Sequence, residues 1–325
     1  MKAAIPLFTL FASVALGQEI PAVVESTPQA QPGLLEQLHY TGLVDVFGGA
    51  HVENDNPTAL RVFDTNGRGA QLSYAKLGLW VDADPVGFRF DIGFGQTLDV
   101  LSFDTTTPVV RQFEQAYISG KLPLHRGVTI DFGRFVTCAG NETVDSRQSW
   151  TYSRSLIFGY AAPFTHTGFR VSAPIVDAWT LQVGAVQGWD VIFDNNNAKS
   201  FFISNSVTPT ENQTFAVSVF GGPELTQDTS TWRWLVDGVW TAKLPRGFDV
   251  SVNADAALEG STAWYGATLS GHYTIGIFDF AARLEAFSDP QNVRLRLAQT
   301  PGAGSWAWEA TASGRASINK FVQVR

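Results

Sequence analysis

Apolar and polar residues alternate along most of this chain with a period of two. The pattern starts near Tyr40 and is clearest over residues 86–94, 234–244, 248–259 and 278–287. In each of these four runs, every charged residue falls on the same face. Since successive side chains of a β-strand point to opposite faces of a sheet, the pattern predicts many strands, each with one apolar and one polar face.

Alternation of this kind fits two architectures. A soluble β-sandwich turns its apolar face to a core, whereas a membrane β-barrel turns that face to lipid. The predicted strands are long, at about 9 to 13 residues, while soluble strands average about 5 or 6 and membrane strands need about 9 to 11. Strand length therefore favours the barrel.

The predicted connections also sort into two alternating kinds. Short turns with Pro or Gly fall at residues 82–85, 122–127, 174–177, 244–247 and 274–276. Long polar loops fall between them, at residues 54–69, 97–111, 137–150, 187–199, 221–231 and 288–305. Short turns at one end and long loops at the other are typical of outer-membrane barrels. We therefore expect an all-β fold, an antiparallel up-and-down transmembrane β-barrel of roughly 14 to 16 strands.

The N-terminus has the pattern of an export signal. A basic start at Lys2 precedes an apolar run that ends at Leu16. This pattern predicts a cleaved secretory signal peptide over residues 1–17. Residues 18–39 are rich in Pro and Gln and predict a flexible lead-in, which leaves residues 40–325 as the barrel domain.

Composition excludes several classes of protein. With 45% hydrophobic and 16% charged residues, the chain is too apolar for intrinsic disorder. Its formal net charge of −8 argues against a nucleic-acid partner. Since Cys138 is the single cysteine, a disulfide framework and a zinc site built on several cysteines are excluded. We expect no cofactor.

Some local stretches are similar to a known family. The segment from Tyr152 to Gly168 resembles the OmpL-like outer-membrane β-barrel porins. Further stretches that fit the same pattern are Phe113–Ile118, Gly133–Val136, Gly188–Asn197 and Gly221–Glu224. The similarity covers about Tyr40 to Arg325. It implies a bacterial outer-membrane barrel in contact with lipid, compatible with an oligomer, that acts as a passive pore without enzymatic activity.

The C-terminus departs from this family pattern. Porins of this kind usually end on a strand with a terminal aromatic residue, whereas this chain ends at Arg325, inside an alternating strand that begins after Ile318. A free sheet edge in lipid leaves backbone groups unpaired. We therefore expect a chain that is incomplete at its C-terminus and extends by roughly 15 to 50 residues.

The polar face of the predicted strands supplies candidate pore-lining residues. These candidates are Arg89, Asp91, Asp131, Asp237, Lys243, Asp249, Asp255, Glu259, Asp279, Arg283 and Glu285. With Arg233 included, eight acids against four bases predict a wet lumen with a mild preference for cations. The alternative is that the pairs Arg89/Asp91 and Arg283/Glu285 neutralise each other in cross-strand ladders.

The loop at residues 137–150 is the best candidate to fold inward and narrow the pore, by analogy with other porins. The candidate constriction residues in and after it are Glu142, Asp145, Arg147 and Arg154. The predicted function is passive diffusion of small hydrophilic solutes or ions through a polar lumen.

Three alternatives carry less weight. The first is a structural or surface-interaction barrel with a plugged lumen. The second is an outer-membrane hydrolase that pairs His166 with Ser153 or Ser155, although no Gly-x-Ser-x-Gly motif supports it. The third is a loop-bound cation at Asp190 and residues 194–197, whose oxygen atoms suit Ca²⁺ but lack the spacing of an EF-hand.

Overall fold

The computed structural model describes residues 33–49, 60–65, 69–102, 107–124, 126–297 and 303–325. The chain divides into two units, Met1–Gln37 and Leu38–Arg325. The described part of the first unit holds one short helix, α1 (Leu34–Gln37). The predicted signal peptide and most of the predicted lead-in lie outside the described residues.

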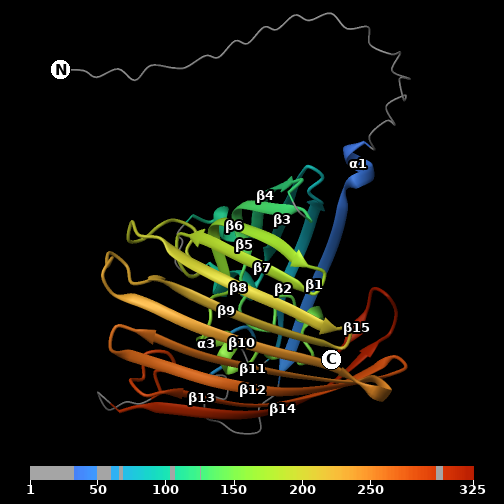
Figure 1. The fold of residues 1–325 in the computed structure, drawn as a ribbon. Helices are drawn as coiled ribbons and strands as arrows, with labels where there is room; N and C mark the ends of the chain where they lie inside the picture. The colour runs from blue at the N-terminus through green and yellow to red at the C-terminus, as the bar shows by residue number, and fades with distance from the viewer. Residues whose placement is uncertain (1–32, 50–59, 66–68, 103–106, 125, 298–302) are drawn as a thin grey trace, which may run out of the picture. The chain divides into compact units, whose positions relative to one another are not determined.

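The second unit is built on one antiparallel sheet of fifteen strands, whose order in the sheet follows the chain (Figure 1). The strands are β1 (His39–Gly49), β2 (Gly69–Val81), β3 (Val86–Phe94), β4 (Phe113–Leu122), β5 (Val128–Val136), β6 (Thr165–Val176), β7 (Trp179–Val186), β8 (Ser200–Thr210), β9 (Gln213–Pro223), β10 (Trp232–Leu244), β11 (Phe248–Glu259), β12 (Thr262–Ile275), β13 (Phe278–Asp289), β14 (Ser305–Ser317) and β15 (Gln323–Val324). The predicted up-and-down β-barrel architecture and its strand number are confirmed.

The other short helices of the described residues lie in connections between strands. They are α2 (Gln96–Leu101), η1 (Val110–Gln112), η2 (Ser146–Gln148), α3 (Leu156–Tyr160) and η3 (Pro245–Gly247). None of the helices in the described residues is both long and apolar enough to span a membrane.

Most short and long connections lie at opposite ends of the strands, as predicted, but the connection between β11 and β12 is a short turn at the long-loop end. Two hairpins were not predicted from the sequence. A tight turn at residues 211–212 joins β8 to β9, and another at residues 260–261 joins β11 to β12. The first turn carries neither Pro nor Gly between the strands. The second uses Gly260 with a φ of 57°, a left-handed conformation that glycine adopts without steric cost.

Side-chain exposure follows the predicted alternation. On β13, Phe280 and Leu284 are 51% and 58% exposed, whereas Arg283 and Glu285 are 1% and 6% exposed. The apolar face of the strand therefore points outward, where lipid would cover it, and the charged face points to the interior of the barrel.

The first and last strands differ from the others in their pairing. β1 pairs with β2 along its whole length, whereas β15 pairs with β14 at two positions only. Within the described residues, no ladder joins β1 to β14 or β15. A recess of about 820 Å³ lies between β1 and residues 320–325, and we call it the seam recess.

The alternation of side chains predicts that an added charge costs more stability on the outward face of a strand than on its inward face. Phe90→Arg and Val252→Arg place a guanidinium against lipid and should each destabilise the barrel by about 2 to 4 kcal/mol. Val239→Arg is the matched control, because Val239 faces the interior and pairs with Asn253, the residue next to Val252 on β11. Equilibrium unfolding in lipid vesicles measures the three values. A larger loss for Val239→Arg than for Val252→Arg would reverse the assignment of faces.

Candidate pore constriction

The connection from β5 to β6, residues 137–164, runs through the interior of the barrel, and we call it the inner segment. The amide of Gly140 donates to Asp237 Oδ1 on β10 at 3.0 Å. The hydroxyl of Ser146 donates to Asp45 Oδ2 on β1 at 2.8 Å. Since β1 and β10 are far apart in the order of the sheet, these contacts place the segment across the lumen.

Polar side chains within the inner segment set its local shape. The hydroxyl of Ser155 accepts a hydrogen bond from the amide of Phe158 at 3.1 Å and so caps the N-terminus of α3. The carboxylate of Asp145 accepts from the amide of Arg147 at 3.0 Å and caps η2 in the same way. Such caps satisfy amide groups that a short helix leaves unpaired.

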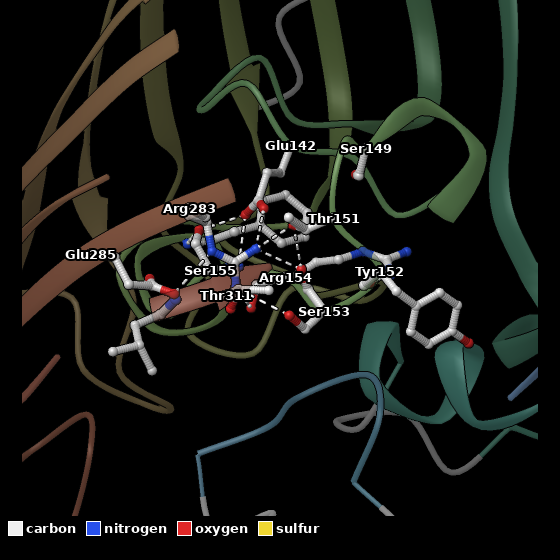
Figure 2. A network of polar contacts seen from close by, with 12 residues as sticks. Glu142, Ser149, Thr151, Tyr152, Ser153, Arg154, Ser155, Arg283, Glu285 and Thr311 are labelled. Carbon is white, nitrogen blue, oxygen red and sulfur yellow. Dashed lines mark hydrogen bonds and ion pairs between the residues drawn. The ribbon is translucent and has the colours of Figure 1, made fainter. Parts of the chain in front are cut away.

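Arg283 on β13 is the centre of a buried network of charges (Figure 2). Its Nε donates to Glu285 Oε1 at 3.0 Å, and its Nη1 donates to Glu142 Oε1 at 3.0 Å. Its Nη2 donates to Glu309 Oε1 on β14 at 3.2 Å. One guanidinium therefore meets three carboxylates, and one of these belongs to the inner segment.

The same arginine also holds the backbone of the inner segment. Its Nη1 lies 2.6 Å from both Thr151 Oγ1 and the carbonyl oxygen of Ser153. Glu285, on the same strand, also binds the segment: the amide of Leu156 donates to Glu285 Oε2 at 2.5 Å. Figure 2 shows Thr151 and Ser153 on one side of Arg283 and Glu285 on the other. Removal of this single side chain would leave several buried polar groups without partners.

Arg154 folds the inner segment onto itself instead of lining an open space. Its guanidinium donates to the carbonyl oxygens of Thr143 at 3.2 Å, of Tyr152 at 2.6 Å and of Val144. It also lies 5.2 Å from the centre of the Phe63 ring. Burial lowers the pKa of this guanidinium from its ordinary value.

A second cluster of charges joins another part of the inner segment to β2, β3 and β4. Lys76 Nζ lies 2.7 Å from Glu114 Oε2, 3.4 Å from Asp91 Oδ2 and 4.0 Å from Asp145 Oδ2. Arg147 Nη2 lies 2.5 Å from Asp145 Oδ2. Burial would raise the pKa of the Asp145 carboxyl, but the hydrogen bonds and charge of Arg147 outweigh burial and lower that pKa.

Two of the predicted charge pairs form within a single strand. Arg89 Nε lies 2.9 Å from Asp91 Oδ1 on β3, and Arg283 Nε lies 3.0 Å from Glu285 Oε1 on β13. The expected neutralisation is present, but the pairs are not cross-strand ladders. Residues two apart share one face of a strand, which is why these side chains meet.

Other predicted lining residues pair across neighbouring strands, in part with arginines that the sequence analysis missed. Arg170 on β6 and Arg315 on β14 were not among the candidates, although both lie on the inward face of a strand. The cross-strand ion pairs are Asp131–Arg170 at 2.7 Å, Glu259–Arg233 at 2.6 Å and Asp279–Arg315 at 2.9 Å.

Asp237 and Asp255 stand opposite each other on β10 and β11. They are 0% and 4% exposed, because the inner segment covers them. Asn253 Nδ2 donates to both carboxylates, at 2.6 Å and 3.2 Å. Lys243 and Asp249 stand opposite each other nearer the short-turn end of the same strands and are more exposed.

The seam recess is an open space that borders the inner segment. It is lined from the segment by Ser146, Arg147 and Tyr152. Its charged lining residues are Asp45, Arg61, Asp64, Arg147, Arg315, Lys320 and Arg325. Polar and charged groups therefore face this space from the segment, from β1 and from β14.

His166 lies in an apolar setting. Its ring is 1% exposed and stacks with Phe202 and Phe220. Its nitrogens lie 3.3 Å from the carbonyl oxygen of Gly188 and 3.3 Å from Thr137 Oγ1. The hydroxyls of the two serines considered as nucleophiles contact Arg283 and Glu142 instead.

Asp190, in the loop from β7 to β8, holds the end of the inner segment and the start of β6. Asp190 Oδ1 accepts from the amides of Phe164 and Thr165 at 2.7 and 2.8 Å. Burial raises the pKa of Asp190 to about 6. In the part of the chain that the structure describes, no three His, Cys, Asp or Glu side chains gather to hold a metal ion.

Glu224, directly after β9, fastens the same loop from the other side. Its Oε2 accepts from the amide of Trp189 at 2.7 Å, and its Oε1 accepts from the hydroxyl of Ser200 at 2.5 Å. Burial raises the pKa of Glu224 to about 7.

Comparisons with known proteins find a matching family and solved structures with a similar fold. Residues 37–325 match the model of the family described as "Putative beta-barrel porin-2, OmpL-like". A loop-L8 deletion mutant of OmpT, an outer membrane protein of Vibrio cholerae, superposes with a TM-score of 0.53 at 10% identity, over 87% of each chain. OmpT of the same organism, expressed in the outer membrane, gives 0.50 at 10% identity, over 76% of this chain and 74% of that one. No relative was found among curated protein sequences.

Loss of the Arg283 side chain should weaken the barrel. Arg283→Leu leaves Glu285 and Glu142 buried without their cation, and breaking such a network costs about 3 to 5 kcal/mol. The control is Arg111→Leu, because the exposed pair of Arg111 and Asp99 should contribute at most about 1 kcal/mol. Urea unfolding in lipid vesicles measures both. If the double variant Arg283→Leu/Glu285→Leu recovers no stability relative to Arg283→Leu, uncompensated charge is not the cause.

Glu224 should make stability depend on pH. Because its pKa is raised from 4.5 to about 7, the folded protein binds a proton more readily than the unfolded chain. Ionisation of Glu224 therefore lowers the unfolding free energy progressively as pH rises from about 4.5 to 7. Glu224→Gln should flatten this decline, whereas Glu211→Gln, in the exposed β8–β9 turn, should not. Unfolding curves at several pH values test this, and identical slopes for all three proteins would contradict it.

Proposed function

Because the chain belongs to the OmpL-like family of β-barrel porins and is a protein of the bacterial outer membrane, we propose that it lets small hydrophilic solutes or ions diffuse passively through its lumen. The inner segment forms the constriction of this pathway. Export through the signal peptide at residues 1–17 belongs to the same proposal.

The observation that carries this proposal is the way in which the inner segment is fastened. Glu142 is bound to Arg283 on one wall, and Asp145 is bound beside Lys76 on another. Held at both sides, the segment has a defined position across the lumen. A fixed polar obstruction of this kind limits the size of the solutes that can pass, and it does not close the pathway by hydrophobic collapse.

Within this constriction we assign separate roles to the candidate residues. Arg147 lines the seam recess and is the group that a passing solute would meet. Glu142, Asp145 and Arg154 hold the segment in place through the contacts described above. The inward charges of the wall strands, such as Asp249 and Lys243, contribute to the electrostatic potential along the rest of the pathway.

A plugged barrel is the second candidate function, because one observation favours it. Inward-facing Leu235, Trp264 and Phe287 pack with Leu156 and Ile157 of α3 in a buried apolar cluster. Trp264 Nε1 also donates to the carbonyl oxygen of Ala161 at 3.1 Å. This part of the lumen is filled by side chains, so that any pathway must pass on the side of the seam recess.

Conductance separates the two functions. The purified barrel, inserted in planar bilayers, should give discrete steps of current, whereas a plugged barrel should give none. Arg147→Glu should shift the reversal potential in a salt gradient in the direction of greater cation selectivity, because it replaces a positive charge at the constriction with a negative one. The control is Arg111→Glu, which changes charge outside the constriction. A folded barrel that inserts but does not conduct would rule out the diffusion pathway.

A further inference from the structure

His272 on β12 stands between two carboxylates on the neighbouring strands. Its Nδ1 lies 3.2 Å from Asp249 Oδ2 on β11, and its Nε2 lies 3.3 Å from Asp279 Oδ1 on β13. A neutral imidazole carries one N–H donor, whereas the imidazolium carries two. Only the protonated ring can donate to both carboxylates, so that the geometry of this site matches the charged form.

The face of the same ring is covered by the inner segment. Trp150 stacks on His272 with ring centroids 5.2 Å apart and an interplanar angle of 12°. A cation over the face of a tryptophan is attracted by the ring electrons, and a neutral ring lacks this attraction. The protonation state of His272 therefore changes how strongly Trp150 is held.

The residues just before Trp150 are also held from the wall. The carbonyl oxygen of Arg147 accepts from Arg315 Nη1 at 3.3 Å, and that of Ser149 accepts from Arg325 Nη2 at 2.9 Å. These contacts involve groups that stay charged at all relevant pH values. The stack on His272 is thus the titratable fastening among the three.

The other charges around His272 balance its two acids. Lys243 stands opposite Asp249 in the pairing of β10 with β11. Arg315 Nε donates to Asp279 Oδ2 at 2.9 Å, and the hydroxyl of Thr274 donates to Asp279 Oδ1 at 2.7 Å. Asp279 therefore keeps two other partners when the ring is neutral, and Asp249 keeps a cation at the opposite position of the neighbouring strand.

We infer that His272 is a positioning residue for the constriction, which holds Trp150 and residues 147–149 against the wall more firmly when its ring is protonated. The effect of His272 on conduction rests on the proposed pore function, whereas its contacts with Trp150 and the two carboxylates do not. Histidine changes charge between about pH 5 and 8. The constriction is accordingly tighter at acidic pH and looser at alkaline pH.

Thiol labelling tests the inference without any need for conduction. Ser149→Cys, in a Cys138→Ala background, places a single thiol beside Trp150, and its rate of modification by a small maleimide reports how often the segment opens. The rates are compared with those of the same protein carrying His272→Phe, which keeps an aromatic ring but not the charge. Both proteins carry the same thiol, so that the ratio of their labelling rates at one pH is not affected by how far the thiol is ionised at that pH.

At pH 5.5 the His272→Phe protein should label about threefold or more faster than its parent, and at pH 8 the two rates should agree. His272→Gln, which also lacks a titratable ring, should behave like His272→Phe. His39→Phe is the matched control, because His39 also stacks on a tryptophan, Trp80, but outside the constriction. His39→Phe should leave the labelling rate unchanged at pH 5.5 and at pH 8.

Equal labelling of the parent and His272→Phe at pH 5.5, or the same ratio at both pH values, would overturn the inference. In bilayers, the open-channel current of the parent should decrease between pH 8 and pH 5.5, and His272→Phe should remove this dependence. A barrel that fails to conduct but shows the labelling pattern would contradict the proposed function and leave the positioning role of His272 supported.

Discussion

The constraint on which this structure depends is the need to satisfy every backbone hydrogen bond of a segment that faces lipid. Hydrocarbon offers no partner for an unpaired amide or carbonyl group, so that each strand from β2 to β13 is paired along both edges. This continuous ladder turns alternate side chains outward to lipid and inward to the lumen. The same geometry that brings Phe280 and Leu284 to the outer surface brings Arg283 and Glu285 inside.

The inward charges then create a second requirement, because many of them are covered by the inner segment. A buried charge is tolerated where it is paired and its hydrogen bonds are complete. Arg283 meets this condition by serving three carboxylates and the segment backbone together. Lys76 on β2 likewise meets the carboxylates of Glu114 and Asp91. The charges that line the barrel are therefore also the groups that position the inner segment.

Much of this architecture was predictable because the signals are local. A period of two over nine or more residues indicates a membrane strand, and parity alone assigned the inward face of residues such as Asp237 and Glu259. The turn at residues 211–212 was missed because it lacks the Pro or Gly that marks the other hairpins. Arg170 and Arg315 were missed as lining residues, although the parity of their strands carries the information.

By itself, the sequence determined the class of fold and the face on which each strand residue lies, since both follow from alternation along the chain. The inward path of residues 137–150 was expected only by analogy with other porins. The tertiary structure alone decided which charges meet. Glu142 and Arg283 are 141 positions apart, and Trp150 of the inner segment stacks on His272 of β12. Contacts over such separations depend on the curvature of the sheet and on the path of the inner segment, and no local pattern encodes either.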